Sequence, residues 1–285
     1  MIRLFVSDLD GTLLNDQHVL SDENRKAVQL LRSKGISFMP ASGRDYHGVQ
    51  MAIEESYLQP KAICLNGAEF YDNDGKLLIS NPLSKDSVAA VQAVIDKYEL
   101  DADYYTSLGR CILYGGDDLK THLIERIKKA APKEMREDPL RFMERIKFFD
   151  TLIVEKTIEG ILERTILKIE TRFDDLELRE QVLQELETIE GIITTSSSLH
   201  NLEINSIEAT KGHMIEQVCE TYGYKKEEVI VIGDGMNDIP MLERFPNSYA
   251  MGQAPQAVKD VAKFETDSNA NDGVAKLIYK ILAEM

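Results

Sequence analysis

Short runs of apolar residues alternate along the chain with segments whose apolar residues recur every three or four positions. The runs predict strands buried on both faces, over residues 2–6, 36–40, 61–65 and 229–232. Between the first two runs, one helical face carries Ala27, Val28, Leu30 and Leu31. Ser21 is a suitable N-cap for this helix and Gly35 ends it. Strand, helix and strand in this order predict a βαβ unit and a parallel sheet.

Further elements follow the same two patterns. Helices are expected over 46–55, from Thr210 to Tyr222, from Pro255 onwards and over 273–284, with a strand over 248–251. The segment Asp72-Asn73-Asp74-Gly75 resembles a calcium-binding loop, but Phe70 stands where the first ligand would be. It therefore predicts a hairpin turn before a strand over 76–79.

The pattern changes at Asn81-Pro82. Beyond it, helices are expected from Ser84 and over 119–131 and 176–186, with strands over 104–106, 111–114, 166–169, 192–195 and 202–204. Residues 132–157 are charged and fit neither pattern. Helices alternating with short strands predict an α+β layer with one sheet face covered. We therefore expect a core of residues 1–82 and 208–285 with residues 83–207 inserted as a second domain.

Composition and charge narrow the classes of partner. The 285 residues suggest two domains, and the contents of 43% hydrophobic and 29% charged residues are ordinary for a globular protein. A net charge of −16 argues against nucleic acid or an anionic membrane as the main partner. It also means that a phosphate site would need a metal and a local cation. Scattered cysteines, no long apolar run and no signal peptide predict a cytoplasmic protein.

Candidate chemistry begins where the first strand ends, at Asp8-Leu9-Asp10-Gly11-Thr12. Side chains two apart on a strand point the same way, so Asp8 and Asp10 share one site if the extended conformation continues that far. Two close carboxylates repel unless a cation such as Mg²⁺ lies between them. One aspartate could then act as a nucleophile and the other as general acid and base. Taken alone, this stretch is explained equally well as an acidic strand end before a glycine turn, with no catalytic role.

Three other segments carry candidate residues at comparable places. In Ala41-Ser42-Gly43-Arg44 a hydroxyl and free N–H groups could hold a phosphate, although an ordinary turn is the better reading of this segment alone. Lys211 starts a helix, against the preference of the helix dipole. The segment Gly233-Asp234-Gly235-Met236-Asn237-Asp238 lacks the third glycine of a dinucleotide fingerprint and fits metal binding better. All four segments are expected at one edge of the parallel sheet, where ligands bind.

Together these motifs resemble the haloacid dehalogenase superfamily: Asp-x-Asp-Gly-Thr, Ser-Gly-Arg, Lys-Gly and Gly-Asp-Gly-x-Asn-Asp, in that order. The insert between the second and third motifs resembles that of Cof-type phosphatases with an α/β cap. The departures are small: Ser42 stands where threonine is common, and the residues before Lys211 are unusual. The resemblance implies a doubly wound parallel-sheet core of Rossmann-like type with an inserted α+β cap domain of the C2 type.

The resemblance also implies a mechanism. Asp8 is expected to attack phosphorus and form an aspartyl-phosphate, while Asp10 acts as general acid and then base. Mg²⁺ is expected to be held by Asp8, the Asp10 carbonyl oxygen, Asp234 and Asp238. Phosphate or substrate is expected to be bound by Leu9, Ser42, Gly43, Arg44, Lys211 and Asn237. The implied activity is Mg²⁺-dependent hydrolysis of small phosphomonoesters, sugar phosphates in particular, with no nucleic acid, membrane or obligate protein partner.

Two other functions remain as alternatives. A phosphosugar mutase would return the phosphoryl group to a sugar, and a phospho-aspartate signalling or binding protein would use the same aspartate without turnover. The five histidines show no metal-ligand spacing. In the inserted domain, His200, Asn201 and Glu203 are candidates for substrate contacts on polarity alone.

Overall fold

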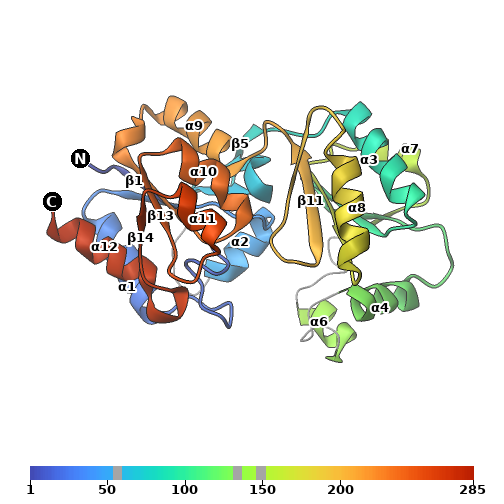
Figure 1. Ribbon diagram of the computed structural model, residues 1–285, viewed down its shortest axis with the longest axis horizontal. Coiled ribbons are helices and arrows are strands. Elements are labelled where there is room, and N and C mark those ends of the chain that lie inside the picture. The colour runs from blue at the N-terminus through green and yellow to red at the C-terminus, as the bar shows by residue number, and fades with distance from the viewer. Residues whose placement is uncertain (54–59, 131–136, 146–151) are drawn as a thin grey trace. The chain divides into compact units, whose positions relative to one another are not determined.

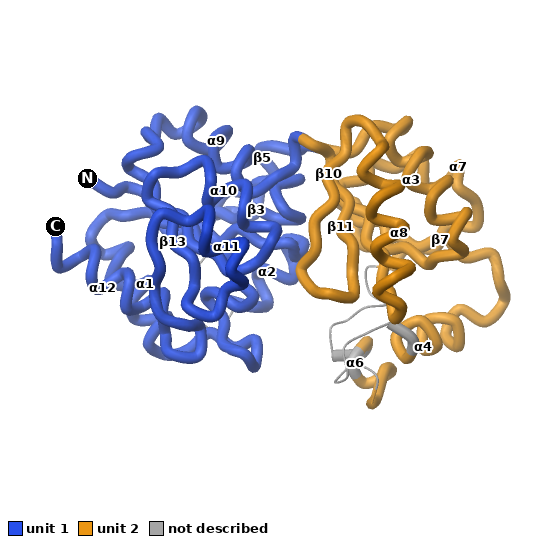
Figure 2. The backbone as a smooth tube through the Cα atoms, in the orientation of Figure 1, with its two compact units in different colours: residues 1–81, 208–285 blue, residues 82–207 orange. Residues whose placement is uncertain are grey.

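The computed structural model describes residues 1–53, 60–130, 137–145 and 152–285. Two compact units make up the chain (Figure 2): unit 1 comprises Met1–Asn81 and Glu208–Met285, and unit 2 comprises Pro82–Ile207. The first junction lies one residue before the predicted position and the second lies at it. That the two units are independent domains stays a prediction.

Unit 1 is built on a five-stranded parallel sheet in the order β14-β13-β12-β1-β2 (Figure 1). Its strands are β1 (Leu4–Ser7), β2 (Ser37–Pro40), β12 (Val229–Gly233), β13 (Asn247–Ala250) and β14 (Phe264–Glu265). Strand β1 lies between β2 and β12, in register with Leu4 opposite both Ser37 and Val229. Their apolar side chains are buried on both faces, as continuous apolar runs predict. The predicted parallel sheet is confirmed; β14 was not predicted.

Helices cover both faces of this sheet. They are α1 (Asp22–Ser33), α2 (Tyr46–Ile53), α9 (Lys211–Tyr222), α10 (Ile239–Arg244), α11 (Gln256–Val261) and α12 (Gly273–Ala283). Leu4 and Val6 join one buried cluster with side chains of α9 and α10. Phe5 points to the other face, and there α1 and α12 lie side by side (Figure 1). The end predicted for α2 at Glu55 lies outside the described residues.

A small antiparallel sheet extends unit 1. Its strands are β3 (Ala62–Cys64), β4 (Glu69–Tyr71) and β5 (Leu77–Ser80). The predicted hairpin turn is confirmed, because Asp72 Oδ1 accepts bonds from the N–H groups of Asp74 and Lys76, both at 2.9 Å. This carboxylate serves the turn. After β2 the backbone bends toward β3, and the Ser42 N–H donates to the Ile63 carbonyl at 2.9 Å.

Unit 2 contains a six-stranded mixed sheet in the order β10-β11-β9-β6-β7-β8. Its strands are β6 (Ala102–Thr106), β7 (Gly109–Leu113), β8 (Ile153–Glu155), β9 (Lys168–Arg172), β10 (Ile192–Thr195) and β11 (Asn201–Ser206). All neighbours are antiparallel except β7 and β8. The expected α+β architecture of the insert is confirmed.

Alternate residues of the unit 2 strands face an apolar layer. Among the described residues of unit 2, the helices are α3 (Lys85–Lys97), α4 (Leu119–Ala130), α6 (Pro139–Arg145), α7 (Ile158–Leu162) and α8 (Leu176–Leu186). Tyr104, Ile169 and Leu202 pack with side chains of α3, α7 and α8. Between these positions, Lys168, Glu170 and similar polar residues point to the opposite face. Helix α6 and strand β8 lie in the stretch that the sequence left unassigned, and α7 was not predicted.

The three cysteines, Cys64, Cys111 and Cys219, are free and buried. None of the helices in the part of the chain that the structure describes combines the length and apolar character needed to cross a bilayer.

Candidate active site

The motifs of unit 1 meet at the carboxyl edge of its parallel sheet. Asp8 directly follows β1, Ser42 follows β2 by one residue after Ala41, and Asp234 directly follows β12. Lys211 is the first residue of α9, whose N-cap Thr210 accepts a hydrogen bond from the His213 N–H at 3.1 Å. The fold thereby brings together residues that are more than two hundred positions apart in sequence.

A buried ion-pair network forms the centre of the site. The Lys211 ammonium group donates to Asp8 Oδ1 and to Asp238 Oδ1, both at 2.6 Å. Lys211 and Asp238 are fully buried and Asp8 is 5% exposed. The second oxygen of Asp238 accepts from the N–H groups of Asp234 and Gly235 at 2.9 and 2.8 Å, which fixes the loop after β12. A buried lysine is tolerated here because two carboxylates compensate its charge.

Three carboxylates lie close enough together to hold a cation. Oxygen atoms of Asp8, Asp234 and Asp238 lie within 4.8 Å of one another. Thr12 donates to Asp234 Oδ1 at 2.8 Å and orients that side chain. Gly11 has a φ of +78°, and a Cβ there would lie 2.3 Å from Asp234 Oδ2, so only glycine fits beside this carboxylate. Carboxylate oxygens are ligands for hard divalent cations, and the site is therefore an acidic metal-binding site of the expected kind.

Burial and mutual repulsion perturb the acids of this cluster. Burial raises the pKa of Asp8 well above its usual value, against the effect of the neighbouring Lys211 ammonium. Burial and the nearby Asp238 raise the pKa of Asp234 to about 6. For Lys211, burial would lower the pKa, but the charges of Asp238 and Asp8 outweigh it and raise the pKa. A cation among the three acids would relieve their repulsion and favour their charged forms.

Asp10 lies in a different environment from Asp8. The extended conformation does not continue to Asp10, because β1 ends at Ser7. A turn follows, closed by hydrogen bonds from the Thr12 N–H to the Leu9 carbonyl and from the Leu13 N–H to the Asp8 carbonyl. The Asp10 carboxylate instead accepts two bonds from the Arg44 guanidinium, at 2.6 and 2.7 Å. His18 Nδ1 lies 2.9 Å from the same carboxylate.

These partners set the charge of Asp10. Burial alone would raise the pKa of Asp10, but hydrogen bonds from His18 and Arg44 lower it below its usual value. The Arg44 guanidinium therefore binds the carboxylate of Asp10, the residue predicted to act as general acid and base. That Arg44 contacts phosphate stays a prediction, as does metal binding by the Asp10 carbonyl oxygen.

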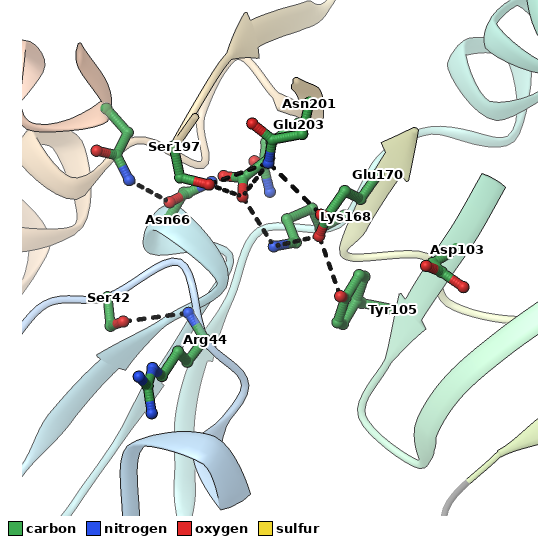
Figure 3. A network of polar contacts seen from close by, with 12 residues as sticks. Ser42, Arg44, Asn66, Asp103, Tyr105, Lys168, Glu170, Ser197, Asn201 and Glu203 are labelled. Carbon is green, nitrogen blue, oxygen red and sulfur yellow. Dashed lines mark hydrogen bonds and ion pairs between the residues drawn. The ribbon is translucent and has the colours of Figure 1, made fainter. Parts of the chain in front are cut away.

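The remaining predicted residues lie around this centre. Ser42 is buried, and its hydroxyl accepts from the Arg44 N–H at 3.2 Å (Figure 3). The Leu9 side chain is fully buried, so its backbone is the part that can reach a substrate. Gly43 lies between Ser42 and Arg44 in the same turn. Asn237 donates through Nδ2 to Asn66 Oδ1 at 3.2 Å. Their roles toward phosphate stay predictions.

Sequence reasoning missed four residues of this site. Thr12 orients Asp234, His18 contacts Asp10, and Asn66 with Gly67 forms a turn that touches the motifs. The Asn66-Gly67 pair predicts a turn directly after the strand expected over 61–65. Because it also follows a strand at its carboxyl end, the rule that identified the other motifs applied to it as well.

The polar face of the unit 2 sheet carries a second buried network (Figure 3). Lys168 lies 3.6 Å from a Glu170 oxygen and 3.5 Å from a Glu203 oxygen, and its ammonium group is 4.4 Å from the centre of the Tyr105 ring. Asn201 donates to Glu203 at 3.3 Å. Of the candidates in the insert, Asn201 and Glu203 thus belong to this network, whereas His200 is exposed with Nδ1 3.0 Å from the Phe173 carbonyl.

Comparison with known proteins agrees with this geometry. A model of the haloacid dehalogenase-like hydrolase family matches residues 5–278. A solved haloacid dehalogenase-like hydrolase from Bacillus subtilis superposes with a TM-score of 0.82 at 25% identity, covering 98% of this chain and 99% of that one.

Curated relatives align over almost the whole length. The chain is 29% identical over 277 residues to the 5-amino-6-(5-phospho-D-ribitylamino)uracil phosphatase YcsE of Bacillus subtilis, covering 97% of this chain and 94% of the relative. It is 30% identical over 285 residues to the phosphatase YbjI of Escherichia coli, which carries the same substrate name, with coverages of 99% and 96%. The chain therefore belongs to the haloacid dehalogenase-like hydrolase family, as one of its Cof-like phosphatases with an inserted α/β cap.

Proposed function

We propose that the protein hydrolyses small phosphomonoesters in a Mg²⁺-dependent reaction that passes through an aspartyl-phosphate on Asp8. The observation that carries this proposal is the buried contact of Lys211 with Asp8 and Asp238 beside a third carboxylate, Asp234. Such a site offers a nucleophilic oxygen together with charges that stabilise a transferring phosphoryl group.

In the first half-reaction an Asp8 oxygen attacks phosphorus in line with the leaving oxygen. The bond from phosphorus to the substrate oxygen breaks as the bond to Asp8 forms. Asp10, in its protonated form, gives its proton to the leaving oxygen, so that an alcohol departs rather than an alkoxide. Arg44 and His18 fix the position of Asp10 but also stabilise its charged form, and proton uptake by Asp10 therefore requires at least one of these contacts to loosen.

In the second half-reaction a water molecule attacks the aspartyl-phosphate. Asp10, now a carboxylate, takes the proton of that water, and the bond from phosphorus to Asp8 breaks. Inorganic phosphate is released and Asp8 returns to its carboxylate form. The low pKa that Arg44 and His18 give Asp10 suits the group that must remain charged before it accepts this proton.

The donor set of Asp8, Asp234 and Asp238 fits Mg²⁺, since it consists of carboxylate oxygens placed close together and largely buried. When bound, the ion would neutralise charge on the phosphoryl oxygens and hold Asp8 in its charged form. We propose that Lys211, Ser42 and Asn237 bind the phosphoryl oxygens, with backbone N–H groups at Leu9 and Gly43 assisting.

For the leaving group we propose an alcohol of a polyhydroxylated metabolite, such as a sugar phosphate. Two relatives are phosphatases of 5-amino-6-(5-phospho-D-ribitylamino)uracil, in which the phosphate is carried by a ribityl chain. That compound therefore belongs in the substrate panel beside sugar phosphates. The site residues of unit 1 contribute to phosphoryl transfer but give no means of choosing between these alcohols.

The nucleophile is tested by Asp8→Asn, which keeps the shape of the side chain but removes the attacking charge. We expect turnover to fall on the order of 10³-fold or more, with the unfolding temperature nearly unchanged. Acid-labile transfer of radiolabelled phosphate from substrate to protein should disappear. Asp74→Asn, in an exposed turn, is the matched control and should behave as wild type. Labelling that persists in Asp8→Asn would place the nucleophile elsewhere.

Metal removal tests the second part of the proposal. Excess EDTA should abolish phosphate release, and added Mg²⁺ should restore it. Measuring free phosphate and isomerised sugar phosphate in the same reaction separates hydrolysis from mutase activity. Full activity in EDTA would refute the metal requirement, and isomerisation without phosphate release would favour the mutase.

A further inference from the structure

A strained turn follows β3 in unit 1. Three successive residues, Leu65, Asn66 and Gly67, have positive φ values of 51°, 62° and 109°. Leucine rarely adopts this conformation, and Leu65 is also completely buried. Strain of this kind persists only where the surrounding structure fixes it, and it is typical of functional sites.

The backbone of the turn is bonded to the Ser42 segment. The Asn66 N–H donates to the Ser42 carbonyl at 3.0 Å, and the Leu65 N–H donates to the Arg44 carbonyl at 2.9 Å. These two bonds set the position of the turn relative to the Ser42 hydroxyl. Both N–H groups belong to residues in the left-handed conformation.

The same turn packs against the start of α9. A Cβ on Gly67 would lie 2.3 Å from the Thr210 carbonyl oxygen and 3.1 Å from the Lys211 backbone nitrogen. Only glycine permits this approach, which brings the turn against the residue whose ammonium group contacts Asp8.

The Asn66 side chain reaches the fourth motif. It is 3% exposed, and its Oδ1 accepts a hydrogen bond from Asn237 Nδ2 at 3.2 Å (Figure 3). A carboxamide nitrogen has two N–H groups. Asn237 donates one of these N–H groups to Asn66. This bond defines the orientation of the Asn237 amide and hence the direction of its second N–H group.

We propose that Asn66 is a positioning residue for phosphoryl binding, acting through Asn237, and that the turn of Leu65, Asn66 and Gly67 sets the relative places of Ser42, Lys211 and Asn237. This inference rests on the proposed function, in which these three residues bind the phosphoryl oxygens. It adds a residue that makes no proposed contact with the substrate itself.

The test is Asn66→Gly, because glycine keeps the positive φ while it removes the carboxamide. We expect kcat/KM for a phosphomonoester to fall about 10-fold, the effect of one hydrogen bond. Inhibition by inorganic phosphate should weaken by a similar factor. Glu99→Gly is the matched control, since Glu99 also has a positive φ, of 51°, and lies in unit 2. It should change neither quantity.

A double-mutant cycle separates positioning from a general structural role. Asn237→Ala alone should lower kcat/KM. Adding Asn66→Gly to it should cause no further loss, because the Asn237 amide through which Asn66 acts is already absent. Asn66→Asp, which retains an acceptor oxygen and tolerates the backbone conformation, provides a second variant if Asn66→Gly does not fold; its added charge should weaken phosphate inhibition.

The outcomes are distinct. Wild-type kcat/KM and phosphate inhibition in Asn66→Gly, or losses that multiply with those of Asn237→Ala, would overturn this inference and leave the proposed function standing. A wild-type protein that releases phosphate from no ester with Mg²⁺ present would overturn both.

Discussion

At the scale of single residues, Lys211 is the side chain on which the site depends most. Its ammonium group is fully buried and lies 2.6 Å from an oxygen of each of two aspartates. Removing it would leave two buried carboxylates beside a third with no compensating charge, an arrangement that costs free energy of folding as well as activity.

Lys211→Met should therefore lower turnover on the order of 10²-fold or more. It should also make Mg²⁺ a stronger stabiliser. The rise in unfolding temperature on adding Mg²⁺ should be larger in the variant than in wild type, because the ion then supplies the positive charge that Lys211 no longer provides to the buried carboxylates. Thermal unfolding with and without Mg²⁺ measures this difference.

Lys226→Met is the control, since Lys226 is 46% exposed in its ion pair with Glu216 and such pairs contribute little. A variant at Lys211 with normal turnover, or with no added response to Mg²⁺, would contradict the role of this ammonium group in the cluster.

The sequence supported the identity of the motif residues but not their contacts. Asp8, Asp234 and Asp238 could be predicted to meet because each lies at or just beyond the end of a parallel strand. The contacts of Asp10 could not be predicted, because they depend on a turn closed by backbone bonds and on a guanidinium from the turn after β2. His18 likewise reaches Asp10 from a backbone conformation with positive φ that no local pattern specifies.

At the scale of elements, β9 shows why a charged strand is difficult to recognise. The sequence predicted a strand over 166–169, whereas β9 spans Lys168–Arg172. Ile169 faces the apolar layer, but Lys168 and Glu170 are also buried, at 2% and 3% exposure, because they compensate one another across the polar face. Charged residues are ordinarily expected in water, so tertiary partners, and not propensity, determine this strand.

This network predicts the stability of the protein in acid. Burial alone would raise the pKa of Glu170, but the charges of Arg172 and Lys168 lower it from 4.5 to about 2. A carboxyl group whose pKa is lower in the folded than in the unfolded protein stabilises the fold at pH values above its unfolded pKa. This stabilisation is lost as the pH falls from about 4.5 toward about 2. The full contribution is on the order of 3 kcal/mol.

Glu170→Gln should therefore unfold at a lower temperature than wild type at pH 7, and the gap should narrow below about pH 4.5. Glu180→Gln, at a residue whose carboxylate is 56% exposed beside Arg179, is the control and should leave the unfolding temperature within error at every pH. A gap that stays constant between pH 7 and pH 3 would show that the charge of Glu170 is not responsible.

At the scale of the whole molecule, every residue of the four predicted motifs belongs to unit 1, although unit 1 is made of two distant stretches of sequence. The stretches are joined at the junction itself, because Asn81 Nδ2 donates to the Glu208 carbonyl oxygen at 3.3 Å. The ends left by removing residues 82–207 therefore lie close enough for a short linker.

Replacing residues 82–207 with a short Gly/Ser linker should leave measurable hydrolysis of acetyl phosphate, an activated ester of small size. Discrimination among sugar phosphates should become weaker, because the family resemblance assigns selection of the leaving group to the cap. Folding of the shortened protein is verified first by circular dichroism. The same deletion with Asp8→Asn is the control for residual activity, and a folded core that keeps the substrate ranking of the full chain would contradict this role of the cap.

The position of β1 has a consequence for synthesis on the ribosome. Strand β1 pairs on one side with β2, which follows it closely, and on the other with β12, which begins at Val229. Unit 2 is continuous in sequence and can form its sheet as soon as Ile207 has emerged, whereas one edge of β1 stays unpaired until β12 has been made. During that interval the nascent chain exposes Leu4, Phe5 and Val6, which are buried in the folded protein. Such an edge attracts chaperones or other unfinished chains, so a translational pause shortly after residue 207 would raise the fraction of protein lost to aggregation.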